Sequence, residues 1–133
     1  MNDALVCFNN GYNCSQAIFS TYSQKYGLNA ELAQKIACGF GAGMGRLGKT
    51  CGAVTGAYML IGLIHGDDKE KTYEMVQEFS ERFIDRNKST DCKVLLDVDL
   101  ITGDMDFAAK QVQRICPDLV KDATEILEEL LSL

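Results

Sequence analysis

Residues 50–66 read TCGAVTGAYMLIGLIHG, an apolar stretch whose large side chains follow helical rather than strand spacing. These side chains recur every three or four residues, which places them on one face of an α-helix. We therefore predict a helix that begins at Thr50 and ends at Gly66. The apolar run is far shorter than the roughly 20 residues needed to cross a bilayer, so we predict no membrane span.

Helical spacing continues on both sides of this stretch. No segment alternates between apolar and polar residues for long enough to predict a sheet. We therefore predict an all-α protein, a compact single-domain bundle of five to seven helices over residues 1–133. The further helices are expected after the capping residues Asn13 and Asn29, over about 68–86, after Asp91, and as two separate pieces around 107–115 and 119–131.

Composition narrows the classes of function. The chain has 133 residues, of which 47% are hydrophobic, and a net charge of −6. This charge excludes nucleic acid as an expected partner, because phosphates require clustered Lys and Arg. The first residues carry no basic export signal, so we expect a cytoplasmic protein. The broad Leu and Ile stripe of the last predicted helix is compatible with a homodimer.

Six cysteines are a high number for a chain without an export signal, and four of them lie near predicted helix N-termini. Free backbone N–H groups and the helix dipole favour an anion there, so we expect each thiol pKa to fall below its usual value of about 8.5. Thiolate is the form that attacks disulfides and binds metals. The four candidates are Cys14 after Asn13, Cys51 after Thr50, Cys92 after Asp91, and Cys116 before Pro117.

The other two cysteines differ from these four. Cys7 and Cys38 continue apolar stretches, and we predict that both are ordinary core residues. The only histidine, His65, lies at a predicted helix C-terminus, where a capping role is expected rather than a ligand role.

A glycine-rich loop precedes Cys51. Residues 43–50 read GMGRLGKT and match the phosphate-loop pattern, but a predicted helix precedes them where that pattern needs a strand, so we do not predict nucleotide binding. Arg46 and Lys49 add positive charge that would favour a Cys51 thiolate. Gly52 and Gly56 are spaced by four residues and predict a smooth helix face, which would hold Cys51 against a neighbouring helix, the one that bears Cys14 being a candidate.

Several motifs occur together along the chain: GYNCSQA at 11–17, the glycine loop at 40–48, CGAVTG at 51–56, and the single cysteines Cys92 and Cys116. With these motifs the chain resembles the C_GCAxxG_C_C family of redox-active proteins from near Gly11 to the last helix, although it reads Cys51-Gly52-Ala53 where the family name spells Gly-Cys-Ala. The resemblance implies a cysteine-based redox activity and carries the family's cysteine positions onto the same four candidates.

Three functions remain open for Cys14, Cys51, Cys92 and Cys116. The first is thiol–disulfide exchange or electron transfer with a redox partner protein or a small thiol, in which Cys51 attacks, Cys14 resolves, and the other two form a second pair or a relay. The sequence does not choose among the three pairings of four cysteines. The second is a four-cysteine site for zinc or an iron–sulfur cluster, which requires all four sulfurs in one small volume. The third is a helical interaction module with packing cysteines only.

Overall fold

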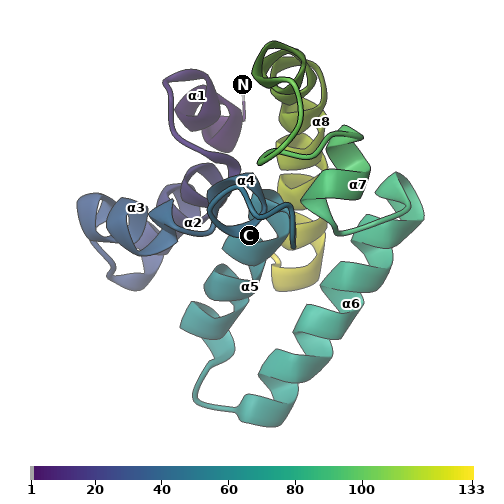
Figure 1. Ribbon diagram of the computed structural model, residues 1–133. Helices are drawn as coiled ribbons and strands as arrows, with labels where there is room; N and C mark the ends of the chain where they lie inside the picture. The colour runs from purple at the N-terminus through teal and green to yellow at the C-terminus, as the bar shows by residue number, and fades with distance from the viewer. Residues whose placement is uncertain (1) are drawn as a thin grey trace.

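Helices make up the architecture of residues 2–133, which the computed structural model describes (Figure 1). Seven of the elements in this part of the chain are regular right-handed α-helices, which confirms the predicted all-α bundle. The elements are α1 (Asp3–Asn9), α2 (Cys14–Ser23), the 3₁₀-helix η1 (Gln24–Tyr26), α3 (Ala30–Cys38), the short turn α4 (Gly41–Met44), α5 (Gly52–His65), α6 (Lys69–Asn87), α7 (Cys92–Leu96) and α8 (Met105–Leu131).

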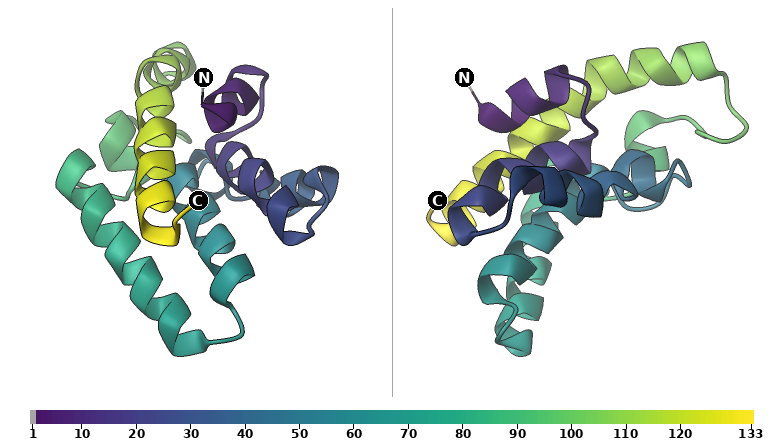
Figure 2. Two further views of the ribbon diagram at one scale, coloured as in Figure 1. Left: turned by 180° about the vertical axis from the view of Figure 1, so that it is seen from behind. Right: turned by 90° about the vertical axis from the view of Figure 1, so that its left-hand side faces the viewer.

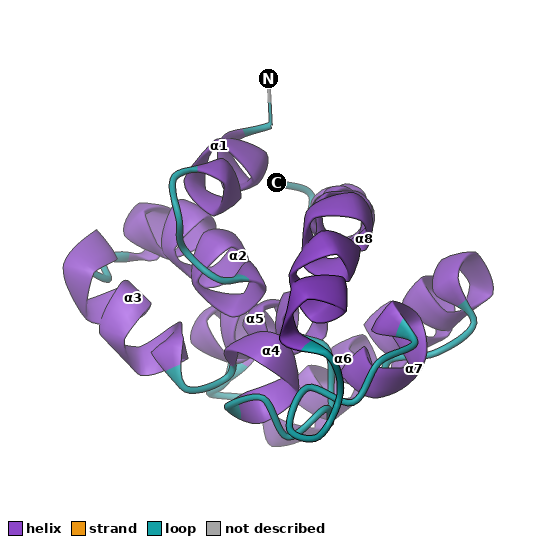
Figure 3. Ribbon diagram, turned by 45° about the horizontal axis from the view of Figure 1, so that its top comes forward, coloured by secondary structure: helices purple, strands orange, loops and turns teal. Residues whose placement is uncertain are grey.

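Loops join these helices directly, and the described residues form no strand (Figure 3). One isolated antiparallel bridge joins Thr50 to Asp91. Between residues 2 and 133 there is also no helix that combines the length and the apolar character required to cross a membrane.

The core lies where α2, α5 and α8 meet. α5 and α6 form a helical hairpin, and α8 contacts α1, α2, α5, α6 and α7 (Figure 1). Ile18, Leu60 and Val120 are fully buried side chains contributed by the three central helices. Burying each such side chain contributes on the order of 2 kcal/mol, so the core fixes the central helices relative to one another.

Glycines let α5 approach α2 closely. A Cβ added to Gly52 would lie 3.2 Å from the Cβ of Cys14, and one added to Gly56 would lie 2.9 Å from the carbonyl oxygen of Ser15. The prediction that the two glycines hold α5 against the helix bearing Cys14 is therefore confirmed.

One prediction about the helices is wrong. α8 runs without interruption through Pro117, where we expected one helix to end and another to begin. Proline removes one backbone hydrogen bond and kinks a helix, and the two halves of α8 run in different directions in Figure 2. Buried residues on both sides of the proline, such as Ala108 and Leu119, keep the helix continuous by packing.

The glycine-rich loop forms a left-handed turn. Residues 42–46 all have φ between 54° and 68°, so α4 is not a right-handed helix. This conformation costs roughly 1–2 kcal/mol for each residue that is not glycine, and here it includes Ala42, Met44 and Arg46. The turn brings Gly43 so close to α7 that an added Cβ would lie 2.6 Å from the Cβ of Cys92.

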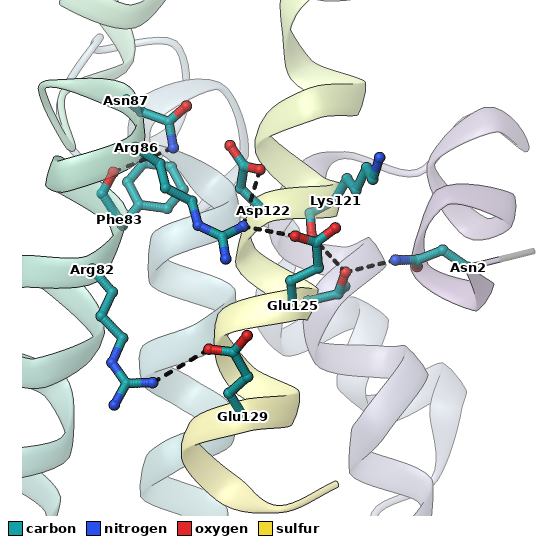
Figure 4. Close-up of polar contacts among 10 residues, drawn as sticks. Asn2, Arg82, Phe83, Arg86, Asn87, Lys121, Asp122, Glu125 and Glu129 are labelled. Carbon is teal, nitrogen blue, oxygen red and sulfur yellow. Dashed lines mark hydrogen bonds and ion pairs between the residues drawn. The ribbon is translucent and has the colours of Figure 1, made fainter.

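Ion pairs join α6 to α8 at the surface (Figure 4). The Arg86 guanidinium lies 2.7 Å from Glu125 and 3.3 Å from Asp122, and Arg82 lies 3.6 Å from Glu129. Half-exposed pairs of this kind contribute up to about 1 kcal/mol, so they support the orientation of α8 rather than determine it.

Candidate functional site

The four cysteines selected from the sequence line one cavity of about 450 Å³. Each sulfur comes from a different element, and all four residues are buried. Cys14 begins α2, Cys51 precedes α5, Cys92 begins α7, and Cys116 lies within α8. The fold therefore brings together residues that are separated by as many as 102 positions, from 14 to 116, in the sequence.

A capping box places Cys14. The Asn13 Oδ1 atom accepts a hydrogen bond from the Gln16 N–H at 2.9 Å, and the Gln16 Oε1 atom accepts one from the Asn13 N–H at 2.9 Å. Asn13 also donates to the carbonyl oxygen of Cys38 at 3.0 Å. This reciprocal pair ends the preceding loop and makes Cys14 the first residue of α2, as predicted.

Backbone pairing around one bridge fixes the positions of Cys51 and Cys92. Around the Thr50–Asp91 bridge, the Cys51 N–H donates to the Thr90 carbonyl at 2.7 Å, and the Cys92 N–H donates to the Lys49 carbonyl at 2.6 Å. The bridge joins the N-termini of α5 and α7. The expected cap of α5 is displaced by one residue, because Cys51 itself occupies the N-cap position instead of Thr50.

Cys116 reaches the cavity from the interior of α8, not from a helix start. The prediction that all four thiols lie at helix N-termini is therefore wrong for this residue. Cys116 directly precedes Pro117 inside α8. Its thiol lies close enough to that of Cys14 for each to shift the pKa of the other.

Burial determines the pKa of two of these thiols, Cys51 and Cys92, contrary to the expectation of lowered values. Burial raises the pKa of Cys51 to about 12, although the Ala53 and Val54 N–H groups at the start of α5 act in the opposite direction. Burial likewise raises the pKa of Cys92 to about 11. A helix N-terminus thus does not produce a thiolate when the sulfur is fully desolvated.

The Cys14–Cys116 pair behaves differently. The side-chain interaction with Cys14 lowers the pKa of Cys116, and this effect outweighs that of burial. The same interaction, followed by burial and the other cavity cysteines, raises the pKa of Cys14 well above its usual value. Cys116 is therefore the cavity thiol best able to exist as a thiolate, for a reason unrelated to a helix end.

The remaining cysteines lie outside the cavity. Cys38 is exposed, so the prediction that it is a core residue is wrong: α3 buries only Ala33 and Ala37. Cys7 is half-buried, with its sulfur 3.8 Å from the Ser20 hydroxyl, and burial raises its pKa. His65 lies in the last turn of α5, as expected, and is not part of the cavity lining.

The geometry does not fit a preformed metal centre. Within residues 2–133, no three or more His, Cys, Asp or Glu side chains come together in an arrangement that could hold a metal ion. A four-cysteine zinc or iron–sulfur site would need four sulfurs around one point. The cysteines share a cavity without meeting that requirement, whereas thiol chemistry requires only that two sulfurs meet.

Sequence reasoning missed most of the cavity wall. Met105, Ala108, Ala109 and Val112 line it from α8, on the same helix stripe as Cys116. Their spacing of three and four residues was the available signal, because such a stripe on one helix predicts a shared face. Arg46, which we expected to influence Cys51, also lines the cavity.

One comparison with known proteins gives a match. A family model described as "Putative redox-active protein (C_GCAxxG_C_C)" matches residues 12–130, which is nearly the whole chain. The matched range contains all four cavity cysteines. No curated protein and no solved structure matches the chain.

Proposed function

The chain belongs to the C_GCAxxG_C_C family of redox-active proteins, and we propose that it carries out thiol–disulfide exchange in the four-cysteine cavity. Cys14 and Cys116 are the reacting pair. The observation that carries this proposal is that both thiols line one cavity and lie near enough for each to shift the pKa of the other. Two thiols that face one cavity can form a disulfide when their side chains rotate toward one another.

The exchange transfers two electrons to a disulfide substrate. The Cys116 thiolate attacks one substrate sulfur, which forms a mixed disulfide and expels the other substrate sulfur as a thiolate. Cys14 then loses its proton and attacks Cys116, which forms the Cys14–Cys116 disulfide and expels the second substrate thiolate. The two expelled thiolates take up two protons, the one released by Cys14 and the one lost earlier by Cys116, and so become two product thiols. The reverse sequence oxidises two thiols to a disulfide.

Cys51 and Cys92 are proposed as the second pair, which exchanges electrons with the first. Sequence position favoured Cys51 as the attacking thiol, but its complete burial and its raised pKa favour Cys116 in that role. The bridge between Thr50 and Asp91 supports pairing Cys51 with Cys92, because it fixes the backbone on both sides. The four thiols thus divide into two pairs within one cavity.

Disulfide mapping tests the proposal. The reduced protein is incubated with excess 2-hydroxyethyl disulfide, remaining thiols are alkylated in denaturant, and the linked peptides are identified by mass spectrometry. We expect a Cys14–Cys116 link that is absent in Cys116→Ser and unchanged in Cys38→Ser. Cys38 is a suitable control because it is exposed and lies outside the cavity.

Two results would overturn the proposal. One is a wild-type protein that retains six free thiols at equilibrium with excess disulfide. The other is a Cys14→Ser, Cys116→Ser double variant that reduces the disulfide as fast as the wild type. The metal content of protein purified without oxygen is measured in parallel, and near-stoichiometric zinc or iron would favour a metal centre instead.

A further inference from the structure

The cavity has the dimensions and the walls of a site for a small molecule. Its volume of about 450 Å³ is typical of ligand pockets, which span roughly 300–1,000 Å³. Phe8 closes it from α1, Leu96 and Leu100 line it beside α7, and Met105 and Val112 line it from α8. An apolar ligand body gains free energy by leaving water against such walls. A peptide-like ligand would instead place its N–H and C=O groups against carbon and leave them without partners.

The charge of the cavity is confined to its rim. Arg46 is the one charged side chain among the described residues that line the cavity, and it is exposed. Its guanidinium forms no ion pair within residues 2–133. The left-handed turn of residues 42–46 holds it there at a backbone cost, with φ of 68° at Arg46. An unpaired guanidinium at the mouth of an apolar cavity is suited to bind a carboxylate in two hydrogen bonds.

Two carboxylates lie next in sequence to residues of the cavity lining, and neither forms an ion pair with Arg46. Asp104 caps α8 and accepts hydrogen bonds from the Asp106 and Phe107 N–H groups at 2.8 and 3.2 Å. Asp99 accepts from Ile101 and Thr102 and lies 3.4 Å from the Lys93 ammonium. The whole chain carries a net charge of −6, which repels anions in general. A preference for an anionic ligand must therefore come from Arg46 itself.

We propose that the cavity selects small, mainly apolar disulfides or thiols that carry a carboxylate, with Arg46 binding the carboxylate at the rim while the sulfur meets the cavity cysteines. This inference rests on the proposed thiol–disulfide exchange and names its substrate class. Arg46 binds the substrate, and Cys116 and Cys14 carry out the exchange. The apolar walls of α8 accommodate the carbon chain between carboxylate and sulfur.

Three disulfides that differ in charge test the selectivity. The second-order rate of oxidation of the reduced protein is measured with 3,3′-dithiodipropionate, which is anionic, with 2-hydroxyethyl disulfide, which is neutral, and with cystamine, which is cationic. Each rate is divided by the rate at which dithiothreitol reacts with the same disulfide. This ratio corrects for the different intrinsic reactivities of the three disulfides. The variants are Arg46→Gln and, as a matched control for net charge, Lys110→Gln, an exposed residue of α8 outside the cavity lining.

We expect Arg46→Gln to slow the reaction with 3,3′-dithiodipropionate about tenfold, the order of magnitude of one charge-assisted hydrogen bond. The rate with 2-hydroxyethyl disulfide should stay unchanged, and Lys110→Gln should behave as the wild type with all three. Equal slowing of all three disulfides by Arg46→Gln, or no slowing of the anionic one, would overturn the selectivity.

A binding measurement separates this inference from the proposed function. Octanoate has an apolar chain and a carboxylate but no sulfur, and its binding to the reduced protein is measured by calorimetry. We expect octanoate to bind the wild type and to lose affinity about tenfold in Arg46→Gln. Octanoate binding without any disulfide exchange would refute the proposed function alone, whereas exchange without charge selectivity or octanoate binding would refute this inference alone.

Discussion

Gly56 of α5 lies directly against the backbone of Ser15 in α2, so that an added Cβ would stand 2.9 Å from the Ser15 carbonyl oxygen and 3.0 Å from the Cβ of Ile18. The contact adjoins Cys14, the first residue of α2. The distance between these two helices thus sets the position of one cavity thiol. Neither the carbonyl nor the Ile18 Cβ belongs to a flexible chain end that could move aside.

Gly56→Ala is expected to destabilise the protein by about 1–3 kcal/mol, the usual cost of overpacking a core. Gly62→Ala in the same helix is the control, since an added Cβ there meets nothing within 4 Å. Alanine should stabilise that position by about 0.5–1 kcal/mol because glycine is a poor helix former. Urea unfolding of both variants checks this pair, and equal effects at the two positions would contradict the close packing of α2 and α5.

The two asparagine caps permit a second comparison. Asn13→Ala removes the cap of α2. Asn29→Ala removes the cap of α3, in which the Asn29 Oδ1 atom accepts a hydrogen bond from the Leu32 N–H at 3.1 Å. Each loss should reduce the free energy of unfolding by about 1 kcal/mol. Only Asn13→Ala should also change the rate at which the cavity thiols react with 2-hydroxyethyl disulfide, because only Asn13 positions Cys14. Identical reaction rates in the two variants would show that the cap does not control the thiol.

Local signals in the sequence were sufficient for much of the fold. Asn13 and Asn29 begin helices where predicted, because their side chains accept hydrogen bonds from free N–H groups within a few residues of their own positions. Asp91 also precedes a helix where predicted, although its side chain does not cap α7. The glycine spacing that brings α5 onto α2 was also visible, since it requires only that four residues make one helical turn. Three of the cysteines that line the cavity, Cys14, Cys51 and Cys92, could be chosen on the same local grounds, because each lies at the start of a helix.

Other features depend on contacts that are distant in the sequence. Cys116 was expected at a helix start because Pro117 favours that position, but packing on both sides of the proline keeps α8 continuous. Cys38 was expected in the core, yet its side chain is exposed, because α3 buries the side that carries Ala33 and Ala37. The thiol pKa values could not be predicted either, because the depth of burial at Cys51 is decided by the helices that surround it.

The raised pKa of Cys51 predicts how stability depends on pH. The folded protein holds this proton until about pH 12, whereas the thiol of an unfolded chain releases it near 9.0. Between these values the unfolded state binds fewer protons, so the free energy of unfolding falls as pH rises, by at most about 1.4 kcal/mol per pH unit for one thiol. Below pH 9 the contribution is fully present.

Cys51→Ser replaces this thiol by a hydroxyl that does not titrate in that range. Urea unfolding in reductant at pH 8.5, 9.5 and 10.5 should therefore show a smaller loss of stability in the variant, by roughly 1–2 kcal/mol over the series. Cys38→Ser is the control, because that residue is exposed. Parallel pH profiles for the wild type and Cys51→Ser would mean that Cys51 is not buried as a neutral thiol.

The effect of Cys14 on the pKa of Cys116 leads to a last prediction. Iodoacetamide reacts with thiolates, so the pH at which each cysteine becomes alkylated follows its pKa. Because Cys14 lowers the pKa of Cys116 while burial raises that of Cys51 to about 12, Cys116 should be alkylated at a lower pH than Cys51. Pulsed alkylation of the reduced protein between pH 6 and 10, with peptides quantified by mass spectrometry, measures both profiles.

Removing Cys14 should reduce this difference in reactivity. In Cys14→Ala, Cys116 loses the neighbour that lowers its pKa while it stays buried, so its alkylation profile should move to higher pH. Cys92→Ala is the matched control: it deletes another thiol of the same cavity, and neither of the two effects on the pKa of Cys116 comes from Cys92. The Cys116 profile should therefore stay in place in that variant. A shift of equal size in both variants would assign the effect to cavity packing and remove the case for Cys116 as the attacking thiol.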